Sequence, residues 1–506
     1  MPLPALSALV VLALTLVGCA GRAGVGDACD RHSDCDDSLQ CVKRVCAARC
    51  ERAPDCGDGY GCDERGFCVV ARGQSGDACT SEVDCAPGLS CRIQVESPTR
   101  MLRRCAHQPA GAPAGAACSA DDDCRNGTCA LGHCVDLCRA TRDCAAGTSC
   151  MQVPHVETDH EQFGGCLVSN GVLSWTLPSP PPDRPRVVLP VPSGATHASL
   201  VLSTAAPRTV GATRVTSPLD HVVYQRCPGA LGEQCSEAEQ RAQFYANDLR
   251  HRHEVGMSVL ALPSTSRGAL QPGAYRADVR SFHVDGSVGP SPSLTAVVRL
   301  GELLILDLHL HFLDLAEHPC GAAFGTEKLD RLSAQTAPPF RHEYLGTLTS
   351  ILKNDGKLAL GTITYEDIVR PDLDGLEIAN AGELLSLGKH ARGINVFFVR
   401  NLSPVGIGAF GPNPGPAGLG GTPQSGIVIG LDTLCFRSWE QLARLTAHEI
   451  ARYMGLYQNV EIGGTLFDGI DDSDGTSSNL MFYSELGGTE LSAGQRDILR
   501  RSPILR

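Results

Sequence analysis

The sequence has few aromatic and few basic side chains for its length. Phe, Trp and Tyr make up 5% of the 506 residues, and 43 Lys and Arg face 56 Asp and Glu, which gives a formal net charge of −13. Proteins that bind nucleic acids carry a basic surface, so this charge balance argues against nucleic acid as a partner. The low aromatic content likewise gives no indication of a surface that stacks on bases.

Beyond its N-terminal segment, the sequence lacks an apolar run long enough to span a bilayer. The N-terminal run, residues 5–15, is also too short, and Leu16-Val17-Gly18-Cys19 follows it. A short apolar run that ends at a small residue is typical of a secretory signal. We therefore expect residues 1–18 to be removed, although no Lys or Arg precedes the run.

The tetrad Leu16-Val17-Gly18-Cys19 resembles the lipobox of bacterial lipoproteins. The resemblance implies that Cys19 becomes the lipidated first residue of a mature chain anchored to a membrane of the cell envelope, at the outer membrane or cell surface. An ordinary signal peptide cleaved nearby is the alternative.

Cysteine, in contrast, is abundant, and most of it is regularly spaced. The chain has 25 cysteines, a number that favours an exported protein because disulfides persist outside the cytosol. Twenty lie in five groups of four, each of which opens with a C-x5-C step whose second cysteine follows an aspartate. The groups are Cys29, Cys35, Cys41 and Cys46; Cys50, Cys56, Cys62 and Cys68; Cys79, Cys85, Cys91 and Cys105; Cys118, Cys124, Cys129 and Cys134; and Cys138, Cys144, Cys150 and Cys166.

This internal repeat predicts small disulfide-bonded units over residues 19–167. Zinc binding is the rival interpretation, but zinc sites usually show C-x2–4-C pairs rather than a five-residue step. The units resemble EB-type and Dickkopf-like cysteine-rich modules of myxobacterial surface proteins, which implies a spacer or binding stalk. Four cysteines allow three connectivities, and the sequence does not choose among them. We expect the remaining pairs to be Cys227–Cys235 and Cys320–Cys435.

Residues 168–300 have the pattern of an antiparallel β-sandwich. Short apolar runs at 198–202, 221–224, 257–260, 275–279 and 296–300 alternate with turn residues, as in all-β domains. The proline-rich segment 178–192 predicts an extended connector between the repeats and these strands.

Residues 301–506 mix strand and helix patterns and predict an α+β domain. Strands are expected at 304–312, 394–399 and 425–429, with an irregular Gly- and Pro-rich loop at 403–423. In the first strand Asp307, His309 and His311 share one face. Two such histidines can share a metal ion, but we expect a solvated strand face instead.

The segment after Ser438 predicts a helix, because Ser438 and Gln441 form a capping-box pattern and Gly455 follows the last apolar position. Its residues 448–458 resemble the zinc helix of the metzincin metalloproteases, HExxHxxGxxH, in which His448, Glu449 and Gly455 match. Downstream, the segment 479–482 resembles the Met-turn and places Met481 in that structural role. The resemblance covers residues 302–506 and implies a metzincin-like fold.

Two of the three zinc positions of that pattern hold other residues, Arg452 and Gln458. A catalytic zinc needs three protein ligands, and a guanidinium group has no acceptor atom and keeps its positive charge. A glutamine oxygen is a poor zinc ligand, and His448 alone is a remnant that cannot hold the ion. Glu449 would be catalytic only in an active enzyme, in which one of Asp468, Asp471 and Asp472 would complete the ligand set. We expect Arg452 to pair with Glu449 instead.

The acidic stretch 468–475 could bind calcium, but it lacks the spacing of an EF-hand loop, and we expect a solvated loop there. The sequence thus predicts a multidomain, lipid-anchored protein with no cofactor and a degenerate metzincin-like domain. That domain would bind a protein or peptide ligand or serve as structure. A working zinc metallopeptidase with atypical ligands is the alternative function.

Overall fold

A computed structural model describes most of the chain. The described residues are 24, 27–42, 45–51, 60–62, 66–70, 73–86, 88–108, 110–158, 161–225, 254–263, 270–302, 304–313, 315–390, 392–404, 406–412, 420–464 and 467–506. The predicted signal segment, Cys19, Cys56 and the predicted pair Cys227–Cys235 lie outside them. The described residues divide into two compact units: residues up to 79 with 83–90 and 105–107 form one, and the others form the second.

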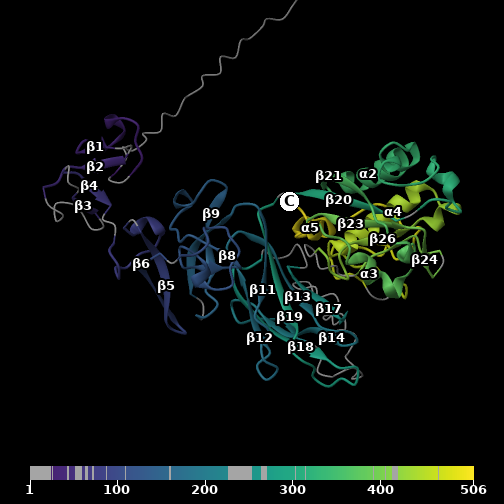
Figure 1. Cartoon of the computed structure of the whole chain (residues 1–506), viewed down its shortest axis with the longest axis horizontal. Coiled ribbons are helices and arrows are strands. Elements are labelled where there is room, and N and C mark those ends of the chain that lie inside the picture. Colours follow the sequence, from purple (N-terminus) through teal and green to yellow (C-terminus); the bar gives the residue numbers. More distant parts are fainter. Residues whose placement is uncertain are drawn as a thin grey trace, which may run out of the picture. The chain divides into compact units, whose positions relative to one another are not determined.

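The cysteine-rich region is a series of small two-stranded hairpins (Figure 1). In the four repeats whose second cysteine lies among the described residues, a single 3-10 turn precedes that cysteine. The turns are η1 (His32–Asp34), η3 (Glu82–Asp84), η4 (Asp121–Asp123) and η5 (Thr141–Asp143). The strands are β1 (Leu39–Val42), β2 (Val45–Ala48), β3 (Tyr60–Cys62), β4 (Cys68–Val70), β5 (Leu89–Ser97), β6 (Arg100–His107), β7 (Cys129–Ala130), β8 (His133–Cys134), β9 (Thr148–Pro154) and β10 (Gln162–Val168).

Disulfides hold these repeats together, which confirms the disulfide interpretation. In the bridges that the structure describes, the first cysteine of a group bonds the third or the second bonds the fourth. The bridges with this pattern are Cys29–Cys41, Cys35–Cys46, Cys85–Cys105, Cys118–Cys129, Cys124–Cys134, Cys138–Cys150 and Cys144–Cys166. The third and fourth cysteines face each other across the hairpin, as Cys129 and Cys134 do, and each bonds back to the segment that precedes the hairpin.

The aspartate before the second cysteine has a structural role, which explains why it recurs in the repeat. In η4, Oδ2 of Asp123 accepts the backbone N–H groups of Ser119 and Ala120 at 2.7 and 2.9 Å. Asp34 and Asp143 make the equivalent bonds in η1 and η5. The carboxylate thus satisfies donors at the start of a turn that is too short to satisfy them itself. These bonds also lower the pKa of Asp123 from its usual value.

Two antiparallel sheets follow the cysteine-rich region. Their orders are β11-β19-β13-β17 and β12-β18-β14-β15, and β16 pairs with β14. Along β18 buried and half-buried side chains alternate, so one face of that sheet packs inward. The strands are β11 (Gly171–Leu177), β12 (Arg186–Val191), β13 (Ala195–Ser203), β14 (Thr209–Thr216), β15 (Val222–Gln225), β16 (Glu254–Val255), β17 (Met257–Leu262), β18 (Gly273–Phe282) and β19 (Ser293–Leu300).

The segment predicted as an extended connector in part forms β12, which pairs with β18. Its proline content misled the prediction, because a proline cannot donate to the interior of a sheet. β12 is an edge strand, so Pro190 is tolerated there.

The C-terminal domain contains one mixed sheet, in the order β21-β20-β23-β26-β25. All neighbours in it are parallel except β25 and β26. Its strands are β20 (Ile305–Phe312), β21 (Ala359–Asp367), β23 (Ile394–Val399), β25 (Ala409–Phe410) and β26 (Ile427–Gly430), and β22 (Gly375–Glu377) pairs with β24 (Asn401–Ser403) apart from it. The longer helical elements are η8 (Pro339–Leu345), α2 (Gly346–Asn354), α3 (Ala381–Leu385), α4 (Trp439–Tyr453) and α5 (Ala493–Arg501). Short 3-10 turns complete the domain: η6 (Gly321–Phe324), η7 (Ser333–Gln335), η9 (Pro371–Leu373), η10 (Ile378–Asn380) and η11 (Leu431–Cys435).

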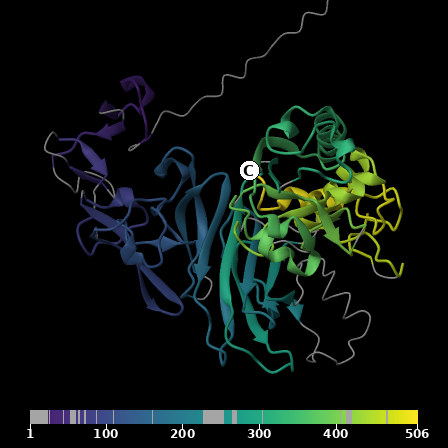
Figure 2. The same ribbon diagram turned by 45° about the vertical axis from the view of Figure 1, so that its right-hand side comes forward.

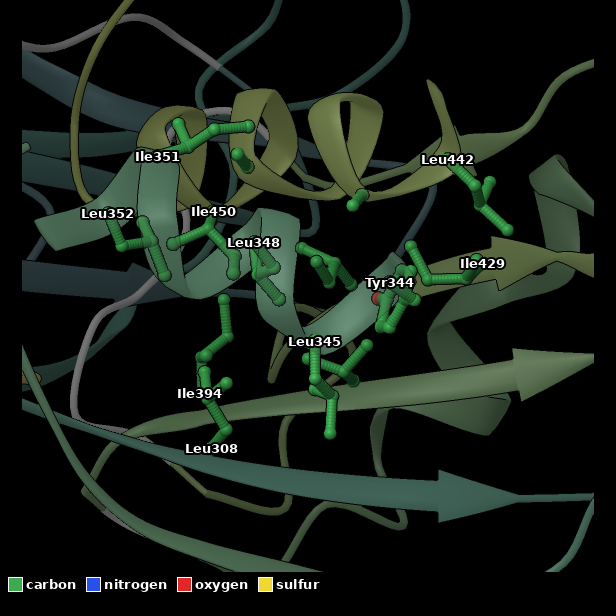
Figure 3. Close-up of a cluster of buried hydrophobic side chains, with 14 of the residues drawn as sticks. Leu308, Tyr344, Leu345, Leu348, Ile351, Leu352, Ile394, Ile429, Leu442 and Ile450 are labelled. Atoms are coloured by element: carbon green, nitrogen blue, oxygen red, sulfur yellow. The ribbon is translucent and has the colours of Figure 1, made fainter. Parts of the chain in front are cut away.

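Helices cover both faces of this sheet, and α2 and α3 lie on opposite sides of it (Figures 1 and 2). Figure 3 shows Leu348 of α2 and Ile450 of α4 directed toward Leu308 and Ile394 of the strands. All four side chains are fully buried. This apolar cluster fixes α4 against one face of the sheet.

The other face of β20 is not solvated, which corrects the sequence-based expectation. Asp307, His309 and His311 are 8, 8 and 2% exposed. Arg506 forms an ion pair with Asp307. The segment before β23 covers the two histidines: His390, in that segment, stacks on His309 with ring centroids 3.7 Å apart. Alternation alone shows which residues share a face, but not what covers that face.

A disulfide, Cys320–Cys435, links the residue before η6 to the last residue of η11, four residues before α4 begins. It closes a loop of 115 residues, a length at which restriction of the unfolded chain contributes most in the chain-entropy model. Among the described residues, no helix is both long and apolar enough to cross a membrane.

We predict that proteolysis under non-reducing conditions, followed by mass mapping, will recover the bridges Cys118–Cys129 and Cys124–Cys134 from the same repeat. In this group the hairpin places the third and fourth cysteines side by side, and each bonds back to a cysteine of the segment just before the hairpin. Both bridges therefore stay within the group. A bridge between the group at 29–46 and the group at 138–166 would contradict the modular architecture.

Candidate functional site

Helix α4 positions the residues that the zinc-helix pattern singled out. It begins at the predicted cap: the Ser438 hydroxyl accepts the Gln441 N–H at 3.3 Å, and the Gln441 side chain accepts the Ser438 N–H at 2.9 Å. It ends before Gly455, whose φ of +116° lies in the region that favours glycine. The chain can therefore leave the helix sharply and continue to Gln458.

A pocket of about 310 Å³ lies beside this helix. One part of its lining comes from α4 and the residue after its turn: Arg444, Leu445, His448, Glu449, Arg452 and Gln458. The remainder comes from the residues around the edge strand β25 and from the segment after Met481: Gly406, Ile407, Gly408, Ala409, Phe482, Tyr483, Ser484 and Glu485. His448, Glu449, Arg452 and Gln458, the positions compared with the zinc-helix pattern apart from Gly455, therefore meet in one cavity.

His448 is fixed as a neutral ring. Its Nδ1–H donates to the Leu480 carbonyl at 2.8 Å, which leaves Nε2 as an acceptor. Burial lowers the pKa of His448 to about 3, and the charges of Arg452 and Arg444 act in the same direction, against the opposing effect of the Leu480 bond. At neutral pH this side chain is therefore an uncharged acceptor.

Arg444 holds the segment that carries the Leu480 carbonyl. Its guanidinium donates to the carbonyls of Leu480, Ser484 and Gly488 at 3.0 to 3.2 Å, and only 7% of the residue is exposed. Sequence analysis missed this role, although Arg444 lies one helical turn before His448 on the same face. Met481 is fully buried in the apolar cluster beside that carbonyl.

Arg452 and Glu449 form an ion pair. Nη1 of Arg452 donates to both carboxylate oxygens, at 3.1 and 3.2 Å. Burial raises the pKa of Glu449, and Arg452 opposes that rise. The carboxylate that would act as a general base in a metallopeptidase thus faces a permanent cation.

Asp468, Asp471 and Asp472, considered above as substitute zinc ligands, lie outside the pocket beside α4. The Asp468 carboxylate, 4% exposed, accepts the Ile470 N–H and the Gln495 side-chain amide. The Asp472 carboxylate accepts the Gly494 N–H at the start of α5. Asp468 is therefore a buried structural residue rather than part of a solvated loop, because α5 packs against it. None of the three aspartates lines the pocket.

Among the described residues, no group of three His, Cys, Asp or Glu side chains close enough to share an ion includes His448. No protein-family model matches the chain, and no curated protein matches it. The chemistry of the pocket must therefore be inferred from its own residues.

We predict that His448 makes the domain sensitive to acid. Its pKa is about 3 in the folded state and 6.5 in the unfolded chain, so between these values only the unfolded state takes up the proton. The free energy of unfolding should then fall with decreasing pH by up to about 1.4 kcal/mol per pH unit more steeply than in His448→Asn. The asparagine amide can still donate to the Leu480 carbonyl.

Urea unfolding between pH 7 and pH 4.5 would measure this difference. Tryptophan emission reports on α4 if both chains also carry Trp175→Phe, because Trp439 is then the remaining tryptophan. Equal pH slopes in the two chains would show that His448 titrates normally in the folded state.

Proposed function

We propose that this protein is exported, anchored to the cell envelope through a lipid on Cys19, and carries a metzincin-like domain that is not a peptidase. Its cysteine-rich repeats then act as a spacer or stalk, and the pocket beside α4 binds a protein or peptide segment or serves a structural role. The Arg452–Glu449 ion pair is the observation that carries the proposal.

The charge of Arg452 argues against a zinc ion in the pocket. A zinc site needs acceptor atoms, and a guanidinium group offers none. The Arg452 side chain is 22% exposed and already bonds Glu449, so a divalent cation at Nε2 of His448 would meet a neighbouring positive charge. Without a metal ion to polarise water, Glu449 has no activated nucleophile to generate.

The pocket retains features suited to binding. It is bordered by residues of β25, an edge strand of the mixed sheet. Edge strands can pair with an extended peptide through main-chain hydrogen bonds, while an adjacent pocket receives a side chain. Such binding would use the cleft of a peptidase without its reaction.

The alternative is an active zinc metallopeptidase with unusual ligands. The free Nε2 acceptor of His448 and the position of Gln458 in the pocket favour it. It requires Arg452 to leave Glu449 when the metal ion binds.

We predict that Arg452→His together with Gln458→His will bind one zinc ion per chain more than the wild type. The double variant restores three imidazoles at the spacing of the zinc-helix pattern and removes the cation from the pocket. Arg452→His alone should gain little, because Gln458 remains the third ligand. Zinc per chain, measured by elemental analysis after dialysis, checks this.

Peptidase assays of the wild type distinguish the two functions. The proposal expects no cleavage that 1,10-phenanthroline inhibits. A wild-type chain whose zinc and chelator-sensitive cleavage are both lost in His448→Asn would establish the alternative. If the double variant gains no zinc, the assignment of Gln458 to the third position is wrong.

We predict that Cys19→Ser will release the protein from membranes or block its processing, because the substitution removes the thiol that would carry the lipid. Fractionation of cells that express each chain, with the mass of the mature N-terminus, checks this. Normal processing and membrane association of the variant would contradict the lipid anchor.

A further inference from the structure

A second cluster of chemically active side chains lies in the C-terminal domain, on the other face of the sheet from α4. His311 is on β20, Glu366 is its register neighbour on β21, and His390 precedes β23. One ligand atom from each residue lies within 4.8 Å of the others. Neither the zinc-helix pattern nor the proposed function uses these residues.

Asn395 fixes the protonation of His311. The side-chain amide of Asn395 donates toward the His390 carbonyl and the Ser425 hydroxyl, each at 3.4 Å, so its oxygen faces His311. That oxygen lies 3.0 Å from Nε2 of His311, which must therefore carry the hydrogen. A neutral ring then has its lone pair on Nδ1. Neighbours that orient metal-binding histidines act in this way.

Nδ1 of His311 is buried and has no hydrogen-bond partner. It faces Oε2 of Glu366 at 3.5 Å, and His311 is only 2% exposed. A lone pair and a carboxylate oxygen at this distance repel each other unless a cation lies between them.

His390 completes the cluster from a fixed position. Its Nε2 lies 2.9 Å from Oε1 of Glu366, and its ring stacks on His309 with 5° between the planes. Both nitrogens of His309 are already used, by Thr364 and by the Arg392 carbonyl, each at 2.9 Å. His309 therefore supports His390 and offers no nitrogen of its own for an ion.

We propose that His311, Glu366 and His390 bind a divalent transition-metal ion, with zinc as the best fit to two imidazoles and one carboxylate. Ligands about 2.0–2.1 Å from a tetrahedral zinc ion lie about 3.4 Å apart, a value between the 2.9 and 3.5 Å separations from Glu366. The metal ion replaces the hydrogen of the Glu366–His390 bond and fills the space between Nδ1 of His311 and the carboxylate.

The site is open on one side. The side chains of Glu366 and His390 are 48 and 32% exposed, so an ion can reach them from solvent and keep water as a fourth ligand. β20 and β21 lie at the opposite end of the sheet order from β25, which borders the α4 pocket. The two sites can therefore be tested separately.

The test measures bound zinc in the full mature chain after equilibrium dialysis against micromolar Zn²⁺ with a competing chelator. The wild type should retain one equivalent, and Glu366→Gln combined with His390→Gln should lose it. Both substituted side chains are partly exposed, so the fold should tolerate the change, and circular dichroism verifies this. Glu366→Gln alone should weaken zinc binding at least tenfold.

Two matched controls place the ion. His448→Asn removes the histidine of the α4 pocket, and His283→Gln removes an exposed histidine of the β18–β19 connection. Both should keep the equivalent of zinc. The proposal is overturned if the wild type and the Glu366→Gln, His390→Gln variant retain equal zinc, or if neither retains any. It is also overturned if His448→Asn loses the zinc, an outcome that would instead support the metallopeptidase.

Discussion

Burial of β20 on both faces is the constraint on which the C-terminal domain depends. Period-two alternation gives its leucines, Leu308 among them, to the cluster under α2 and α4, and gives His309 and His311 to the opposite face. Helix α4 is thereby held in place, and with it the pocket that contains His448. The same alternation removes two histidines from water, so each of their nitrogens needs a partner. If either face of β20 were exposed to solvent, the arrangement on that face would not form.

Around α4, buried charges explain why the residues that line the pocket remain ordered. Arg444 is tied to three carbonyls, and one of these also accepts the hydrogen of His448. Glu449, 7% exposed, is paired with Arg452. Removing one partner of a buried ion pair is strongly destabilising, because the other charge is left uncompensated. Arg452 therefore has a structural role that is independent of any reaction: it provides inside the domain the positive charge that Glu449 would otherwise lack.

The parts of this architecture that depend on local sequence were predictable, and those that depend on pairing across the chain were not. The helix cap at Ser438, the disulfide repeats and the placement of Arg452 one turn from Glu449 all follow from spacings of a few residues. The cluster of His311 and Glu366 joins residues 55 positions apart, through a parallel register that no local pattern encodes. The strand β25 was missed inside a Gly- and Pro-rich loop for the same reason, since pairing with β26 determines it.

The α4 pocket and the cluster of His311, Glu366 and His390 both place a histidine near a glutamate, but they differ in the source of the cation. At α4 the sequence supplies it, because Arg452 lies against the buried carboxylate of Glu449. At β20 and β21 burial raises the pKa of Glu366, but its contacts with His390 and His311 outweigh that effect and hold the pKa below its usual range. A neutral imidazole contributes a dipole and a lone pair rather than a fixed charge. A carboxylate kept ionised among neutral acceptors needs a cation from solution, whereas a carboxylate beside a guanidinium does not. A metal ion thus fits the cluster of His311, Glu366 and His390 and not the pocket beside α4.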